Sequence, residues 1–245
     1  MSDDAEMVRA LPAKVQADAV ACAAEVLPGD PEAVAVAARR VGLAFAAAVA
    51  AAQRPEDWMR VSRQSVMEAV RASIETDLYP GGAMPVVYLV PRGGTLAWSI
   101  THRGVAELCR REGYGLRPVP VHTSAEVEVE AGLVTHLAES PDAWPTSMDD
   151  LRGVMVEVTD PEGRTMRHWC PQAMIRQRAT AKGAGPVWRS WPVEMAIKAA
   201  ILYLARRGAL PVSGLQAAVA YETPPPEVRP PTALADVLGM GGDDE

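Results

Sequence analysis

The chain has 245 residues, of which 49% are hydrophobic and 22% charged, and its formal net charge is −7 at pH 7. A chain of this size and composition is a soluble globular protein with one substantial core or two small ones. The negative total argues against nucleic-acid binding by the whole surface, but not by a local site. Cys22, Cys109 and Cys170 lie far apart and the four histidines lack metal-ligand spacing. We therefore expect no disulfide framework, no bound metal and no cofactor.

The first residues are unlike a secretory signal peptide, because Ser2, Asp3, Asp4 and Glu6 are polar or acidic. The longest apolar run, 41–52, has twelve residues, most of them alanine. A run of that length is too short to span a bilayer. The sequence therefore predicts a cytoplasmic protein without a membrane association.

Helical periodicity predicts two helices near the start of the chain. The Ala-rich segment 32–53 has apolar residues at helical spacing, and its small side chains favour a role in the core or in a subunit contact. A second helix is predicted to begin near Ser65, because Ser65 and Glu68 have the spacing of a capping box. We expect residues 1–55 to form an N-terminal helical region.

A β-hairpin followed by a helix is predicted next. Segments 86–90 and 96–100 are rich in β-branched and aromatic residues, and the sequence Pro-Arg-Gly-Gly at 91–94 lies between them. This pattern is typical of two antiparallel strands joined by a tight turn. The helix is expected over residues 101–112.

Strands and polar loops dominate the middle of the chain. Glutamate and valine alternate over 126–130, which predicts a strand with its valines inward and its glutamates outward. That acidic face should point away from any nucleic acid. Residues 138–150 are expected to form a polar loop. Segments 154–158 and 165–169 flank an Asp-Pro-Glu-Gly turn and predict a second hairpin.

The last third is predicted to be helical and then unstructured. One helix should begin near Pro171, a flexible loop should cover 181–186, and a final helix should run over 193–207. Beyond residue 220 the chain is rich in proline and ends with acidic residues. We expect 221–245 to be a disordered linker and acidic tail.

The segment 164–207 is strongly cationic. It holds nine Lys and Arg residues and a single acid, Glu194, so its net charge is 9 − 1 = +8 in a chain of −7. Trp169, Trp188 and Trp191 lie among these charges. Cations attract phosphate and flat rings stack on bases, so the segment predicts a nucleic-acid site. The alternative is that these are ordinary surface arginines and core tryptophans.

Motifs for several kinds of catalysis are missing. The sequence has no phosphate-binding loop that ends in Lys-Ser/Thr, no nucleophile elbow and no dinucleotide fingerprint. The closest candidates for a metal-dependent nuclease are Glu157 and Asp160, although Asp160 is explained equally well as a turn residue. A binding protein is therefore the leading class.

Two blocks resemble the RecT/Beta family of phage single-strand annealing proteins. YLVPRGGTLAWSITHRGVAELCRREG (88–113) has the family's Tyr-Leu-x-Pro, a basic turn, and the pair Arg103-Gly104 that opens a helix. GPVWRSWPVEMAIKAAILYLARRGALPVS (185–213) has a Pro and a Trp, then Glu-Met-Ala-x-Lys, and ends in Leu-Pro. The resemblance covers roughly residues 56–213.

The resemblance implies an α+β fold in which antiparallel β-hairpins pack with a central helix, distantly similar to the eukaryotic ring-forming annealing mediator. Residues 56–220 would form the DNA-binding core. It also implies ATP-independent annealing of complementary strands in homologous recombination by an oligomeric ring or filament that is not an enzyme. The implied partners are single-stranded DNA, the annealed duplex intermediate, further copies of the chain, a phage exonuclease and the host single-strand binding protein.

Annealing requires that a strand is held by its phosphates while its base edges stay free. The residues that we predict to bind DNA are Lys198, Arg206, Arg207, Arg103, Arg92, Arg176, Arg178, Lys182, Arg189 and Trp188, with Arg92 and Arg103 flanking a groove made by the others. If about six cations meet phosphate, affinity should fall by roughly two to three decades between 50 and 200 mM salt.

Alternatives to these assignments stay open. The family usually has a threonine after the lysine and basic residues a turn later. Here Ala199 follows Lys198. Either Arg206 and Arg207 supply the positive charge that the family has a turn after the lysine, or DNA binding is weaker. Lys198 pairs with Glu194 in a second interpretation, and Trp188 anchors a loop. The function alternatives are a passive strand-coating protein, a metal-dependent nuclease and a purely structural oligomer.

Overall fold

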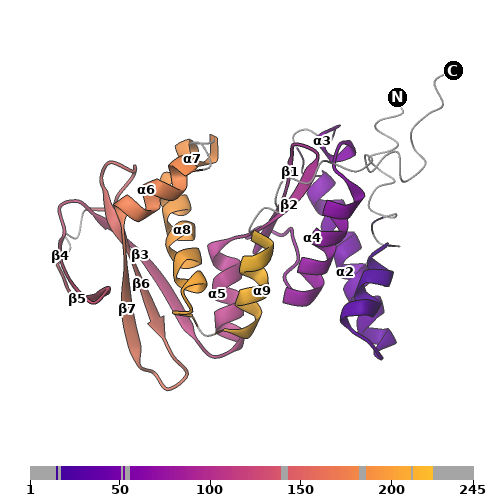
Figure 1. Cartoon of the computed structure of the whole chain (residues 1–245), viewed down its shortest axis with the longest axis horizontal. Helices are drawn as coiled ribbons and strands as arrows, with labels where there is room; N and C mark the ends of the chain where they lie inside the picture. Colours follow the sequence, from indigo (N-terminus) through magenta and orange to yellow (C-terminus); the bar gives the residue numbers. More distant parts are fainter. Residues whose placement is uncertain are drawn as a thin grey trace. The chain divides into compact units, whose positions relative to one another are not determined.

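The computed structural model describes residues 15, 18–50, 52, 56–138, 143–181, 186–210 and 212–222. They fall into two compact units, which are presented here one at a time. Unit 1 comprises the described residues up to Gly104 and from Ala217 onward, and unit 2 comprises those in Val105–Gln216. Helices and antiparallel strands occur together, so the predicted α+β class is confirmed (Figure 1). The predicted tail was 221–245; its first two residues instead end helix α9 (Ser213–Glu222), and 223–245 lie outside the described residues, as does Lys182.

Unit 1 is helical with one β-hairpin. Its core includes Phe45, whose ring lies edge-on to Trp58 with 6.3 Å between the centroids. The elements are a helical stretch over 18–26, α2 (Pro31–Ala50), α3 (Glu56–Met59), α4 (Arg63–Thr76), β1 (Val87–Arg92) and β2 (Thr95–Ile100), with parts of α5 and α9.

Helix α2 is the predicted Ala-rich helix, and it begins at Pro31 and ends at Ala50. With 20 residues and a mean hydropathy of 1.7, it is long and apolar enough to cross a membrane. The twelve-residue run counted in the sequence underestimates this length. Seven of its residues are buried within the protein. A core helix of a soluble protein passes the same test, so length and composition alone are weak evidence for a membrane span.

Helix α4 is capped by Ser62, so the predicted start near Ser65 is wrong by three residues. The amide of Ser65 donates to Ser62 Oγ over 3.3 Å, and the Ser65 hydroxyl donates to the carbonyl of Ser62 over 2.8 Å. Ser65 Oγ also accepts from the amide of Leu96 on β2 over 2.9 Å. Ser65 is therefore a buried link between helix and hairpin, while Glu68 accepts a bond from Gln64.

The hairpin β1–β2 is confirmed, with a tighter turn than the sequence suggested. Only Gly93 and Gly94 separate the strands, with φ of +53° and +83°. Two successive positive φ values favour glycine and match the twist of the flanking strands. Trp98 and Ile100 are both buried, and Trp98 Nε1 donates to Ser73 Oγ over 3.1 Å.

Unit 2 contains a five-stranded antiparallel sheet in the order β3-β6-β7-β5-β4. Helices α6 and α8 contact each other and cover one face of it (Figure 1). The elements are the rest of α5 (His102–Arg111), β3 (Gly115–His122), β4 (Glu126–Glu130), β5 (Leu133–Ala138), β6 (Leu151–Thr159), β7 (Thr165–Pro171), α6 (Gln172–Ala181), α7 (Pro186–Ser190), α8 (Pro192–Arg206) and the start of α9 (Ser213–Glu222).

The two faces of this sheet are packed differently. Val154 and Cys170 face helix α8, and Cys170 Sγ lies 3.8 Å from the carbonyl oxygen of Ala200. On the opposite face Met155 belongs to a smaller apolar cluster against which Trp169 packs. Gly153 is required beneath that ring, because a Cβ there would lie 2.6 Å from Trp169 Cζ2.

Strand β4 follows the predicted alternation only in part. Val127 packs against the apolar cluster, but Val129 is 42% exposed. The register against β5 shifts between Glu128 and Val129, where Thr135 has no partner on β4. The extra residue of this bulge lies on β5, so the alternation of β4 continues and Val129 stays on the same side as Val127, opposite the buried Val134. Val129 is nevertheless exposed on this edge strand, so the predicted burial holds for Val127 and is wrong for Val129.

Both edges of the five-stranded sheet discourage pairing with another strand. The edge strand β3 carries Pro118 and Pro120, which have no amide hydrogen to donate. The other edge strand, β4, carries Glu126, Glu128 and Glu130. Charged and proline-containing edges are a common protection against sheet extension.

Helix α9 follows the helix that was predicted to be the last, and the sequence analysis missed it. Its N-terminus is tied to the end of α5, because Glu112 Oε1 accepts from the amide and the hydroxyl of Ser213 over 2.8 and 2.6 Å. At its other end the Tyr221 hydroxyl donates to Glu75 Oε2 over 2.7 Å, beside Trp98. The stretch over 18–26 and helix α7 were also not predicted.

His168 makes the stability of unit 2 sensitive to acid. Among the described side chains its Nε2 is a buried polar atom without a hydrogen-bond partner, and burial lowers the pKa of the ring. Because the folded-state pKa lies below the unfolded value of about 6.5, the unfolded chain binds more protons as the pH falls. Stability should therefore decrease below about pH 6.5.

We expect the melting temperature of the wild type to fall more steeply between pH 8 and pH 5 than that of His168→Gln, by roughly 2–4 °C for each kcal/mol lost. His136→Gln is the matched control, because His136 is exposed on β5. Parallel curves for the wild type and His168→Gln would contradict this assignment.

Candidate nucleic-acid interface

Within unit 2, ion pairs engage Arg164, Arg167 and Arg176 of the basic segment. Arg164 Nε lies 2.6 Å from Asp160 Oδ2, at the turn between β6 and β7. Arg167 Nε lies 3.1 Å from Glu157 Oε2, which Arg117 also approaches at 3.8 Å. The third cation is Arg176. The segment is therefore less cationic in the fold than in the sequence, because part of its charge is neutralised locally.

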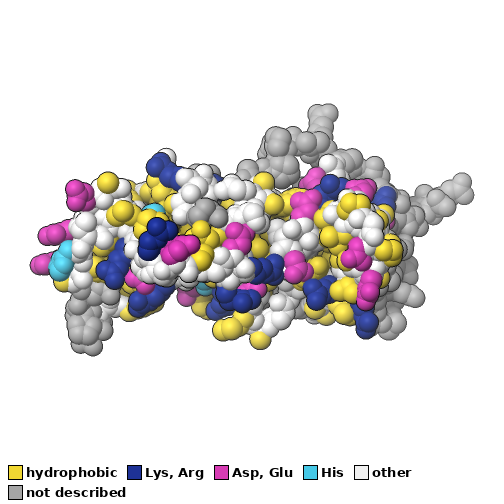
Figure 2. Space-filling model, turned by 90° about the horizontal axis from the view of Figure 1, so that it is seen from below, with side chains coloured by type: hydrophobic (Ala, Val, Ile, Leu, Met, Phe, Trp, Pro, Cys, Tyr) yellow, Lys and Arg dark blue, Asp and Glu magenta, His cyan; other side chains and the backbone are white. Residues whose placement is uncertain are grey.

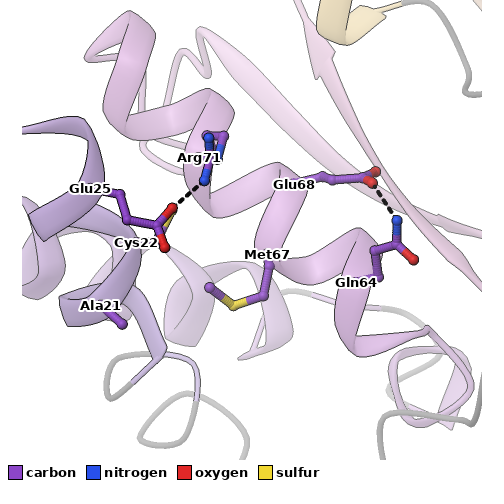
Figure 3. Close-up of a pocket in the computed structure, with 7 residues that line it drawn as sticks. All are labelled: Ala21, Cys22, Glu25, Gln64, Met67, Glu68 and Arg71. Carbon is purple, nitrogen blue, oxygen red and sulfur yellow. Dashed lines mark hydrogen bonds and ion pairs between the residues drawn. The ribbon is translucent and has the colours of Figure 1, made fainter.

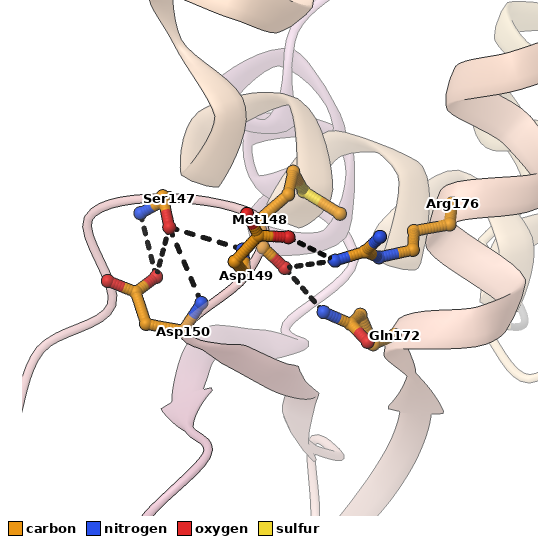
Figure 4. Close-up of polar contacts among 6 residues, drawn as sticks. All are labelled: Ser147, Met148, Asp149, Asp150, Gln172 and Arg176. Carbon is orange, nitrogen blue, oxygen red and sulfur yellow. Dashed lines mark hydrogen bonds and ion pairs between the residues drawn. The ribbon is translucent and has the colours of Figure 1, made fainter.

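Arg176 holds helix α6 to the loop that precedes β6 (Figure 4). Its Nη2 lies 2.6 Å from Asp149 Oδ1 and donates to the carbonyl of Met148 over 3.2 Å. Gln172 donates to the same carbonyl. Within this loop Asp150 accepts from the amides of Thr146 and Ser147, and these bonds hold the pKa of its carboxyl well below the usual range.

Besides Arg176, five described cations of the segment lie on or next to helices α6, α7 and α8, of which α6 and α7 each contact α8. Arg189, Arg206 and Arg207 are exposed, and the others are half-buried. Among the described residues no carboxylate pairs with Arg206 or Arg207, and the Arg207 guanidinium lies 4.7 Å above the Tyr203 ring. The five are Arg178, Arg189, Lys198, Arg206 and Arg207.

Helix α8 presents its cations in two groups. Lys198 and Arg206 are eight residues apart, which is about 12 Å along a helix. Leu202 lies between them on the same side and is only 3% exposed. Lys198 therefore belongs with the N-terminal half of α8, and Arg206 with its C-terminal end. Figure 2 shows one face of the molecule, on which lysine and arginine side chains lie among acidic ones.

Arg92 and Arg103 belong to unit 1. Arg92 ends strand β1 and Arg103 is the second residue of α5, and both side chains are exposed. No ion pair among the described residues engages either of them. Their predicted position beside the groove of unit 2 stays a prediction.

The two tryptophans near the start of α8 differ in exposure. Trp188, which the sequence analysis selected, is half-buried in α7. Trp191 was not selected, yet 61% of it is exposed. The sequence does hold a signal for this position, because Trp191 directly precedes Pro192 and proline favours the first position of a helix. Trp191 is therefore expected just outside the helix, where it has no place on a buried helical face.

The nuclease candidates Glu157 and Asp160 are both bound to arginine, as described above. In the described ranges no group of three or more His, Cys, Asp or Glu residues comes together in a way that could hold a metal ion.

A cavity of about 310 Å³ lies between the 18–26 stretch and α4 (Figure 3). Arg71 is paired with Glu25 and Gln64 donates to Glu68, so these polar groups are engaged. Burial raises the pKa of the Cys22 thiol, which disfavours the nucleophilic thiolate. The lining residues are Ala21, Cys22, Glu25, Gln64, Met67, Glu68 and Arg71.

Exposed cations on helices that cover a sheet are typical of a protein that binds nucleic acid through its phosphates. The sequence model of the RecT family matches residues 45–233, and the chain belongs to the RecT family. The resemblance found in the sequence is thereby confirmed. Membership implies single-strand DNA annealing in recombination by a protein that is not a catalytic enzyme, and it suggests an intracellular DNA-binding protein. A search of curated proteins gives no match.

Proposed function

We propose that the protein anneals complementary DNA strands without ATP, as an oligomer, in homologous recombination. The observation that carries the proposal is the set of five cations on α6, α7 and α8 in an acidic chain of the RecT family. These cations hold the sugar-phosphate backbone, which carries no sequence information, and leave base edges available to a second strand.

The predicted DNA-binding residues contribute unequally in this proposal. Arg178, Arg189, Lys198, Arg206 and Arg207 bind phosphate directly, with Arg92, Arg103 and Lys182 as further contacts. Arg176 binds phosphate only when it leaves Asp149. That exchange is feasible because an exposed ion pair contributes only about 0–1 kcal/mol.

The oligomer follows from the task, because one subunit holds too few nucleotides for a stable duplex. Helix α2 is the proposed contact surface. Its outer side carries Val36 and Leu43, seven residues apart, with exposed fractions of 46% and 63%. The edges of the five-stranded sheet, with their prolines and glutamates, do not favour assembly by strand pairing. A phage exonuclease and the host single-strand binding protein are the proposed protein partners.

Single-strand binding should depend steeply on salt. Five phosphate contacts per subunit predict a slope of about −3.5 in the plot of log affinity against log salt, or roughly two decades between 50 and 200 mM. Fluorescence anisotropy of a labelled 30-mer measures this slope. Binding that barely changes with salt would exclude phosphate as the main ligand and would favour a purely structural oligomer.

Annealing is separated from passive coating by mixing complementary labelled strands with and without ATP. We expect strand pairing to be faster with the protein than without it. The acceleration should be the same with and without ATP. Binding without acceleration would identify a passive coating protein. Shortening of labelled DNA in the presence of magnesium would identify the nuclease alternative.

A further inference from the structure

We infer that Trp191 is a base-stacking residue that receives a nucleobase of the bound strand, an inference that rests on the proposed function. Its exposed fraction of 61% is unusual for a large aromatic side chain. The backbone around it is well anchored, because its amide donates to Val187 over 2.9 Å and its carbonyl accepts from Met195 over 3.0 Å. The ring is therefore presented to solvent from a fixed main chain.

The local structure gives no other reason for a tryptophan at this position. Trp191 is the N-cap of α8, and its side chain makes no capping hydrogen bond. Serine, threonine, aspartate or asparagine would stabilise the helix start by about 1 kcal/mol. A buried tryptophan would contribute through its area, but this ring is mostly outside the core. Trp191 therefore stabilises the protein neither by a capping hydrogen bond nor by a large buried area. A role in binding explains why a tryptophan stands at this position.

The charges around Trp191 suit a single strand. Arg189 is exposed two residues earlier, and Lys198 lies seven residues later, within the first two turns of α8. These cations bind phosphates on either side of a base that stacks on the indole. Glu194 is exposed between them and disfavours phosphate at that point. The strand therefore presents a base, and not its backbone, to the middle of this surface.

Trp188 is less suited to this role. It is half-buried in α7, a short helix that contacts α8. A half-buried ring has less surface available to a ligand than the exposed ring of Trp191. The stacking role that the sequence suggested for Trp188 is thus assigned to Trp191, and Trp188 anchors α7.

The test compares two labelled 30-mers with the same number of phosphates, oligo-dT and a strand of abasic sites. Stacking of a base on an aromatic side chain predicts that Trp191→Ala weakens oligo-dT binding by about five- to one-hundred-fold. Abasic binding should change by less than about twofold, and the salt slope should be unchanged. Trp191→Phe should retain most of the affinity for oligo-dT.

Trp144→Ala is the matched control, because Trp144 is 63% exposed in the loop before β6 of the same unit. It should leave both affinities unchanged. The inference would be overturned if Trp191→Ala weakened binding to both strands equally, or if Trp144→Ala had an equal effect. It would also be overturned if the subunits dissociated in Trp191→Ala, a result that would place the ring in a protein contact. If the wild type binds neither strand in a salt-dependent way, the proposed function itself fails.

Discussion

Replacing Gly104 with alanine should destabilise unit 1 more than any other single-methyl change we can identify there. A Cβ at this position would lie 2.3 Å from the carbonyl oxygen of Val86 and 2.7 Å from Cγ1 of Ile100. Val86 O cannot easily withdraw, because it accepts from the amide and the hydroxyl of Thr101 over 3.0 and 3.1 Å. Thr101 Oγ1 also accepts from the Gly104 amide over 3.1 Å, at the start of α5.

The expected loss is about 1–3 kcal/mol or more, since overpacking against a backbone atom cannot be relieved by a rotamer change. Thermal or urea unfolding followed by circular dichroism measures it. Arg103→Ala is the matched control, because Arg103 is adjacent and exposed. It should retain stability and lose affinity for DNA. A Gly104→Ala variant as stable as the wild type would contradict the close approach.

This pair of variants separates two roles within the Arg103-Gly104 motif. The glycine lets the first turn of α5 approach Val86, the residue before β1, and Ile100 at the end of β2. The arginine extends from the same turn toward solvent and is proposed to meet phosphate. Sequence reasoning finds the motif as a unit, but only the structure assigns packing to one residue and binding to the other.

Local patterns were sufficient for the elements whose signals are local. The hairpin β1–β2 follows from β-branched strands around glycines, and the second hairpin from the turn at Asp160. Helix α8 extends over Pro192–Arg206, within one residue of the prediction. Its start is marked by a proline at the first helical position. Such features depend on neighbours in the sequence and require no knowledge of the tertiary fold.

Other features depend on contacts between distant segments, which a single sequence does not reveal. Ser65, which the sequence suggested as the cap of α4, instead accepts from the amide of Leu96, 31 positions away. The engagement of Arg176 by Asp149 spans 27 positions. Burial of Leu202 between Lys198 and Arg206 is likewise a tertiary effect. The sequence motifs therefore identify the family, but they do not show which arginines, such as Arg176, form ion pairs in the fold.

Removing Arg206 and Arg207 together should weaken single-strand binding much more than removing two other arginines of the same basic segment. In the proposal both bind phosphate, and no carboxylate among the described residues pairs with them. Loss of two phosphate contacts should reduce the magnitude of the salt slope by about 1.4 and lower affinity for all sequences alike. Stability should change little, because both side chains are exposed and the contact of Arg207 with Tyr203 is worth about 0.5–1 kcal/mol.

The control is the double variant Arg164→Ala and Arg167→Ala, which removes the same net charge. These arginines are held by Asp160 and Glu157, so the salt slope should stay close to that of the wild type. Both double variants are compared by anisotropy at several salt concentrations, after their melting temperatures have been checked. If both double variants reduced affinity and salt slope equally, the segment would attract DNA only through its overall positive charge. A site built from particular side chains should instead lose more affinity with Arg206 and Arg207 than with the ion-paired Arg164 and Arg167.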